Sequence, residues 1–181
     1  RDSDGTWFGV PDQVLFPKAV ALLCGAGVFA GFQVVARSIW PGPSRRAALV
    51  TAVAGSVTAL VPSFAIWFAS GLENPLLTLA ATTTAAVLAR AVARGGPARP
   101  GVAVACGLLA ALAALTRPDG AIYLLAYPLV VLLTLRRDRW RALVAAALSG
   151  LAFAVPFGGY LCWRVLTFGR WVPNTAVAKA Q

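Results

Sequence analysis

Three short polar motifs interrupt a largely apolar sequence, and each contains residue types that can bind or react. They are residues 70–75 (SGLENP), 116–120 (TRPDG) and 168–179 (FGRWVPNTAVAK). Each has a plain structural explanation, because Asn74 before a proline, Asp119 and Asn174 are typical of helix starts. Together they supply carboxylates, amides and cations, and the cations can hold an anion, phosphate above all.

Cations and helix starts are expected to meet at one end of the molecule. Helices that start near residues 75 and 121 direct their positive dipole ends to the same side. Four cations are expected on that side: Arg117, Arg164, Arg170 and Lys179. Such a cluster favours a phosphate, and carboxylates at a membrane boundary are candidate functional groups. The predicted substrate-binding residues are Glu73, Asn74, Arg117, Asp119, Asn174 and Lys179.

Long apolar blocks must position these motifs. The chain is 59% hydrophobic with a mean hydropathy of +0.76, whereas soluble domains are about 45–50% apolar. Six helices are expected, at residues 18–35, 47–61 (extending to 68 if it continues past Pro62), 75–93, 101–115, 121–135 and 142–166, the last bent near Pro156. The fourth and fifth are short, so they tilt little, cross a locally thin bilayer, or form a hairpin that does not fully cross. The predicted fold class is all-α, a polytopic transmembrane bundle of about six spans.

Charged residues predict the orientation of this bundle. Three arginine clusters, at residues 37–46, 90–99 and 136–141, hold ten of the 16 basic residues and alternate with loops that hold the acids. Basic loops face the cytoplasm in membrane proteins. The chain is therefore expected to be a multi-pass protein of the cytoplasmic membrane, with the three polar motifs on its outer face.

Composition also excludes several classes of function. The chain has no His, so a His-based triad or metal site is excluded within it. Its arginines lie between apolar blocks rather than along one solvated face, which argues against nucleic-acid binding. Cys24, Cys106 and Cys162 lie in apolar blocks and are expected to be buried small side chains. The absence of Met indicates that Arg1 is not a translation start, so the chain is interpreted as a fragment.

The motifs resemble those of a known family. Gly71-Leu72-Glu73, Arg117-Pro118-Asp119 and Pro173-Asn174-Thr175 with Lys179 resemble the GT-C glycosyltransferases that use polyprenyl-phosphate sugars. The resemblance is in particular to actinobacterial terminal arabinofuranosyltransferases, and flagellar motor control proteins share the motifs. It extends from about residue 12 to the end of the chain.

The resemblance implies a function for residues 1–181 as a partial transmembrane glycosyltransferase domain. A sugar, arabinofuranose among the candidates, would pass from a polyprenyl phosphate to a cell-envelope glycan. The family's catalytic base is a carboxylate in the first outer loop, expected upstream of Arg1 and therefore absent, as is an outer C-terminal domain. The fragment is expected to be inactive alone. Asp2-Ser3-Asp4 resembles a metal-binding Asp-x-Asp element, but no metal site is assigned; a divalent metal stays open, and no other cofactor is implied.

Two other functions remain open at this point. A transporter or channel segment would place polar groups in mid-membrane and break its helices around them, whereas here the charges gather at the ends. A non-enzymatic motility or envelope assembly factor is favoured only by the flagellar relatives. An acidic pair in the loop upstream would favour the enzyme.

Overall fold

The structure, a computed structural model, describes residues 6–7, 10–69 and 74–169 and is helical almost throughout. Two strands of two residues, β1 (Thr6–Trp7) and β2 (Val10–Pro11), pair antiparallel ahead of the first helix. The helices are α1 (Asp12–Ile39), α2 (Arg45–Leu60), α3 (Pro62–Ala69), α4 (Asn74–Ala93), α5 (Pro100–Thr116), the 3-10 helix η1 (Pro118–Leu125), α6 (Ala126–Thr134) and α7 (Arg139–Phe168). The predicted all-helical fold is confirmed.

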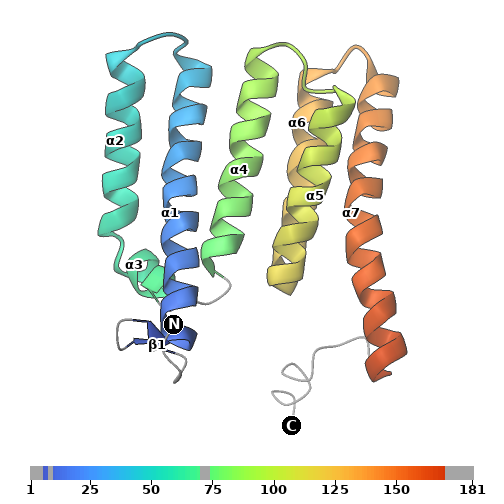
Figure 1. Cartoon of the computed structure of the whole chain (residues 1–181). Coiled ribbons are helices and arrows are strands. Elements are labelled where there is room, and N and C mark those ends of the chain that lie inside the picture. Colours follow the sequence, from blue (N-terminus) through green and yellow to red (C-terminus); the bar gives the residue numbers. More distant parts are fainter. Residues whose placement is uncertain (1–5, 8–9, 70–73, 170–181) are drawn as a thin grey trace.

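The longer helices stand side by side in one bundle (Figure 1). α1 packs against α2 and α4, α4 against α5, and α7 against α5 and α6. The α1–α2, α4–α5 and α6–α7 connections all lie at one end, at the top of Figure 1, and α3 lies near the other end. All three arginine clusters belong to those connections and the adjoining helix ends, so we call this the basic end.

Three helical segments are long and apolar enough to cross a membrane: residues 15–39, 74–93 and 139–168. Two shorter apolar helices, Pro100–Thr116 and Pro118–Thr134, accompany them. A bilayer core of about 30 Å needs about 20 helical residues. The three long segments meet this length and the two shorter helices do not. By length and composition, the chain therefore has helices of the kind that membrane proteins use.

Several helix boundaries differ from those predicted. The second predicted helix is divided at Val61, which is extended (φ −74°, ψ 112°) because a residue before proline is disfavoured in the helical region. The fifth begins three residues earlier, as a 3-10 turn started by Pro118. The last runs unbroken from Arg139 to Phe168, through Pro156.

Small side chains fill the core, and large apolar ones face outward. Ala103, Ala113 and Ala142 are fully buried, whereas Leu166 is 87% and Leu60 79% exposed. Soluble proteins bury their large apolar residues, but membrane bundles place small residues between helices and large ones against lipid. This burial pattern agrees with a membrane environment. The buried alanines thus form contacts between the helices.

Several threonine hydroxyls within the helices are satisfied locally, whereas the buried Ser149 hydroxyl of α7 has no hydrogen-bond partner in the described part of the chain. The hydroxyls of Thr51, Thr58 and Thr84 each donate to the carbonyl oxygen four residues earlier, at 2.8 Å. This arrangement removes unpaired donors from an apolar setting. The buried Tyr127 hydroxyl donates to the Pro97 carbonyl at 3.0 Å and so ties α6 to the α4–α5 connection.

The cysteines follow the prediction in two cases of three. Cys24 and Cys106 are buried. Cys162 is exposed on the outer surface of α7, so its predicted burial was wrong. An apolar block does not by itself decide which face of its helix meets a neighbour.

Candidate functional site

Arg117 stands between two helices at the end of the bundle opposite the basic end. Its backbone N–H donates to the Ala113 carbonyl at 3.0 Å and closes α5. Its backbone is extended (φ −147°, ψ 137°), as expected of a residue before Pro118. Pro118 then occupies the first position of η1, where its missing N–H costs nothing. The sequence therefore folds locally so that an arginine side chain leaves the bundle at a helix end.

Asp119 holds the guanidinium of Arg117 by two parallel hydrogen bonds. Nε donates to Oδ1 at 3.0 Å and Nη2 donates to Oδ2 at 3.1 Å, a bidentate ion pair. The side chains are 36% and 65% exposed, respectively. The hydrogen bond from Arg117 lowers the pKa of the Asp119 carboxyl below its ordinary value, and the nearby positive charge acts in the same direction. Asp119 is therefore ionised at neutral pH.

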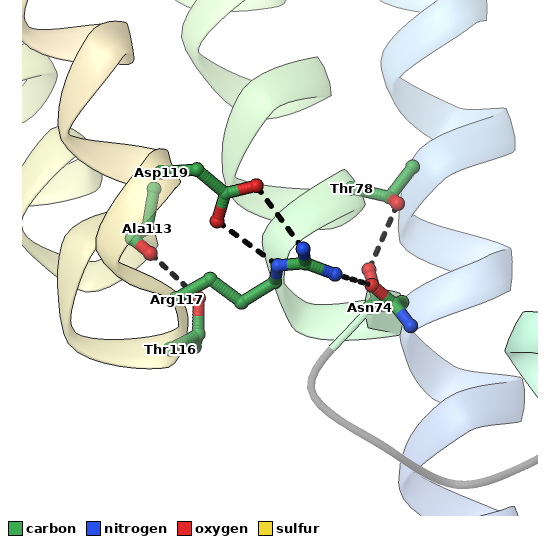
Figure 2. Close-up of polar contacts among 6 residues, drawn as sticks. All are labelled: Asn74, Thr78, Ala113, Thr116, Arg117 and Asp119. Carbon is green, nitrogen blue, oxygen red and sulfur yellow. Dashed lines mark hydrogen bonds and ion pairs between the residues drawn. The ribbon is translucent and has the colours of Figure 1, made fainter. Parts of the chain in front are cut away.

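Asn74 joins the pair from a distant part of the sequence. Nη1 of Arg117 donates to Oδ1 of Asn74 at 2.7 Å, across 43 residues (Figure 2). Asn74 is the first residue of α4, and its backbone carbonyl accepts a hydrogen bond from the Thr78 hydroxyl at 2.8 Å. The start of α4 and the α5–η1 turn are thus linked through one guanidinium. Asn74, Arg117 and Asp119 are called the Arg117 cluster below.

Gly120 allows the backbone of the α5–η1 turn to pass close to the last turn of α5. A Cβ at Gly120 would overlap the carbonyl group of Ala113, in the last turn of α5. Its N–H donates to the Arg117 carbonyl at 2.9 Å. Only glycine fits at this position. The tight turn that it allows keeps Asp119 beside Arg117. Sequence reasoning did not single out Gly120, although a glycine after Pro-Asp is a usual turn signal.

The structure brings three of the six predicted site residues into contact. Asn74, Arg117 and Asp119 form the cluster, and Arg164, in the last turns of α7, has its Nη1 2.9 Å from the Tyr160 hydroxyl. The other three predicted residues lie outside the described part of the chain: Glu73, Asn174 and Lys179.

The prediction that Asp119 caps the start of the fifth helix is corrected. Arg117 occupies the cap position, and Asp119 lies in the first turn, because Pro118 takes the first helical position.

The described cavities lie away from the Arg117 cluster. One of about 420 Å³ opens between α1 and α4 at the basic end and is lined by Arg37, Arg90 and Arg94. Another, of about 450 Å³, is an apolar groove among α1, α2 and α4. The sequence marked these arginines only as indicators of orientation. Their gathering around a cavity depends on the packing of α1 against α4, which charge patterning does not reveal.

A metal site finds no support within the described residues, where no group of three or more Cys, Asp or Glu side chains could hold an ion. Asp2 and Asp4, the candidate Asp-x-Asp element, fall outside that part of the chain. The Arg117 cluster combines one cation with one carboxylate and an amide. That combination suits a phosphate or hydroxyl ligand better than a metal ion.

Comparisons with protein-family models, with curated proteins and with solved structures found no match to this chain.

Proposed function

We propose that the chain is part of a membrane glycosyltransferase that takes a sugar from a polyprenyl-phosphate donor and transfers it to a cell-envelope glycan. The observation that carries the proposal is the Arg117 cluster: an oriented guanidinium at the end of a membrane-type helical bundle. The motif that contains Arg117 is one of the three that resemble the GT-C glycosyltransferases. Arabinofuranose is the candidate sugar that the resemblance suggests.

The orientation of Arg117 matters for phosphate chemistry. Two partners on different helices hold the plane of its guanidinium, so little conformational entropy is lost when an anion approaches. The starts of α4 and η1 lie beside it, with N-terminal dipole ends that favour negative charge. A donor anchored in the bilayer by its polyprenyl chain would present its phosphate at this level.

The reaction requires charge stabilisation at the phosphate. The bond from the anomeric carbon to the phosphate oxygen breaks, and the bonding electrons remain on the phosphate. The acceptor hydroxyl attacks that carbon and loses its proton to a carboxylate base, expected in the family's upstream loop. Arg117 and Lys179 would stabilise the growing negative charge, an effect exerted mainly in the transition state. Glu73, Asp119 and Asn174 would orient these cations or the sugar hydroxyls.

A six-span arrangement completes the proposal. α1, α4 and α7 have the length to cross, while α2, α5 and η1–α6 pack alongside them, with upper ends at a common level and lower ends at different levels (Figure 1). A bilayer that thins locally, or helices with little tilt, would let the shorter ones cross as well. The basic end would then face the cytoplasm and the Arg117 cluster the outside.

A transfer assay with the product of the complete gene tests the proposal. Arg117→Ala is expected to lower kcat/KM for a synthetic polyprenyl-phosphate sugar by about a hundredfold to a thousandfold, as does removal of one oxyanion donor. Arg136→Ala, an exposed arginine at the basic end, is the matched control and should leave transfer unchanged. Folding of each variant is checked by size-exclusion elution and circular dichroism.

Two results would decide against this role. Near-normal turnover in Arg117→Ala would show that the cluster only ties α4 to the α5–η1 turn. Loss of transfer in Glu73→Gln, with the upstream carboxylates dispensable, would place the base at Glu73. A protein that transports a lipid or ion but transfers no sugar would instead support the transporter alternative.

A further inference from the structure

Four arginines, in or beside the ends of three helices, line two adjoining cavities at the basic end. Arg37 lies in the last turn of α1, Arg90 and Arg94 at the end of α4, and Arg99 directly before α5. The cavity of about 420 Å³ is lined by Arg37, Arg90 and Arg94, and a second, of about 170 Å³, by Arg90, Arg94 and Arg99. Because both cavities are lined by Arg90 and Arg94, they adjoin each other at the end of α4. These four residues are called the arginine pocket.

The local backbone brings Arg99 back toward α4. Gly95 has a φ of +63°, and the N–H of Gly96 donates to the Ala91 carbonyl at 2.9 Å, which ends α4 in a left-handed turn. The Arg99 side chain then lies against Gly96, where a Cβ would meet its Nε and Cδ. Two consecutive glycines therefore allow both the reversal of the chain and the position of Arg99.

The described part of the chain does not balance the charge of the pocket. Of the acidic residues that the structure describes, only Asp138 lies at the basic end, and its side chain accepts from the Arg141 N–H at 3.1 Å as the cap of α7. Within the described residues no carboxylate pairs with any of the four arginines. Arg90 and Arg94, one helical turn apart, repel each other. An anion would relieve this repulsion and bridge α1, α4 and α5.

The position of the pocket indicates the source of that anion. It opens where the apolar segment of α4 ends, at the level at which lipid headgroups meet a membrane protein. Trp40 and the 76%-exposed Trp140 lie at the same end, as is typical of a membrane interface. Arginine binds phosphate through a planar fork of donors, and basic pockets between transmembrane helices bind anionic headgroups. The main cavity lies within the range of about 300–1,000 Å³ of small-ligand sites.

We infer that the arginine pocket binds the phosphate headgroup of an anionic phospholipid on the side of the membrane opposite the Arg117 cluster. The bound lipid bridges the ends of α1, α4 and α5. This site is independent of the proposed glycosyl transfer, because it uses other residues at the other end of the bundle.

Lipid retention in native mass spectrometry tests the inference. The purified chain in neutral detergent is titrated with phosphatidylglycerol and, separately, with phosphatidylcholine. Phosphatidylglycerol should bind preferentially, and the Arg90→Gln/Arg94→Gln variant should lose affinity for it by about tenfold to a hundredfold. The matched control is Arg136→Gln/Arg137→Gln, which removes two exposed arginines from the same end but from neither cavity. It should bind like the unaltered chain.

Two further variants and a competition with inorganic phosphate distinguish a specific lipid site from general charge attraction and from a soluble phosphate site. Gly96→Ala, which displaces the Arg99 side chain, should weaken binding without removing a charge. Arg90→Lys/Arg94→Lys keeps the charge but loses the planar fork, and should also weaken it. Equal losses in the pocket and control variants would show that net charge alone attracts the lipid and would overturn the site. Full displacement of the lipid by millimolar inorganic phosphate would identify a soluble phosphate as the ligand and overturn the lipid assignment.

Discussion

Arg117 combines exposure with a fixed geometry, and these two properties have different consequences. An exposed ion pair contributes only about 0–1 kcal/mol to stability, so the bond to Asp119 does little to hold the fold together. It does determine where the guanidinium points, with Asn74 as the third contact. The cluster is therefore better suited to orienting a cation than to stabilising the bundle.

The pairing predicts a measurable titration. Because Arg117 lowers the pKa of Asp119, the pair is complete above the ordinary Asp pKa of about 3.9 and is lost as the pH falls through the lowered value. Carboxyl ¹³C shifts of Asp-labelled protein, recorded from pH 7 to pH 2, should show this. In Arg117→Gln the pKa of Asp119 should rise toward the ordinary value, because the hydrogen bond that lowers it is lost. An unchanged Asp119 titration would show that the ion pair does not form in solution.

At the scale of elements, close approach of small residues holds the bundle together. Gly107 of α5 faces Ser149 and Ala152 of α7, and a Cβ at Gly107 would overlap the Ser149 carbonyl oxygen. Ala103, Ala110 and Ala142 add further buried small side chains to the core. In lipid, where the hydrophobic effect does not drive helix association, such close packing is a principal source of stability.

Gly107→Ala is therefore expected to destabilise the bundle by about 1–3 kcal/mol, the usual cost of overpacking. Gly150→Ala is the matched control, because Gly150 lies in α7 with open space at its Cβ position. It should be neutral, or stabilise by up to about 1 kcal/mol through helix propensity. Thermal unfolding in detergent, followed by circular dichroism, measures both. Equal melting temperatures for the two variants would contradict the close α5–α7 contact.

The whole molecule has two chemically different ends. The basic end carries the arginine pocket, and the opposite end carries the Arg117 cluster, which Figure 2 shows in close-up. Trp140 and Trp163, 76% and 55% exposed, lie near opposite ends of α7. Their separation along the helix is about 34 Å at 1.5 Å per residue, close to the hydrocarbon core of about 30 Å. Both ends would then lie at membrane interfaces.

This geometry predicts a labelling pattern in intact cells. In a background with all three native cysteines replaced by alanine, single cysteines at Pro43, Pro100 and Arg137 should resist an impermeant thiol reagent. Cysteines at Pro118 and Thr167, exposed at the other end, should react. Permeabilised cells should label at all five positions, which controls for burial. The reverse pattern would place the Arg117 cluster in the cytoplasm and remove the support for an external lipid-linked donor.

Much of the element structure was predictable from the sequence for local reasons. The apolar blocks, the arginine clusters between them and the Pro-containing helix starts located most helix ends closely. The exceptions are α1, which begins at Asp12 rather than at residue 18, and the boundaries at Val61 and Pro118, which proline decided. Hydropathy and turn chemistry depend on neighbouring residues, so they are readable along the chain. The gathering of the arginine clusters at one end follows from the same alternation.

Only the tertiary structure decided which residues meet. The contact of Asn74 with Arg117 across 43 residues, the outward position of Cys162 and the convergence of Arg37 with Arg90 all depend on how each helix is rotated about its axis. A helix that is apolar on every side has no polar face to reveal that rotation. Its neighbours are selected by where small side chains allow close approach, and that selection is a property of pairs of helices rather than of any one segment.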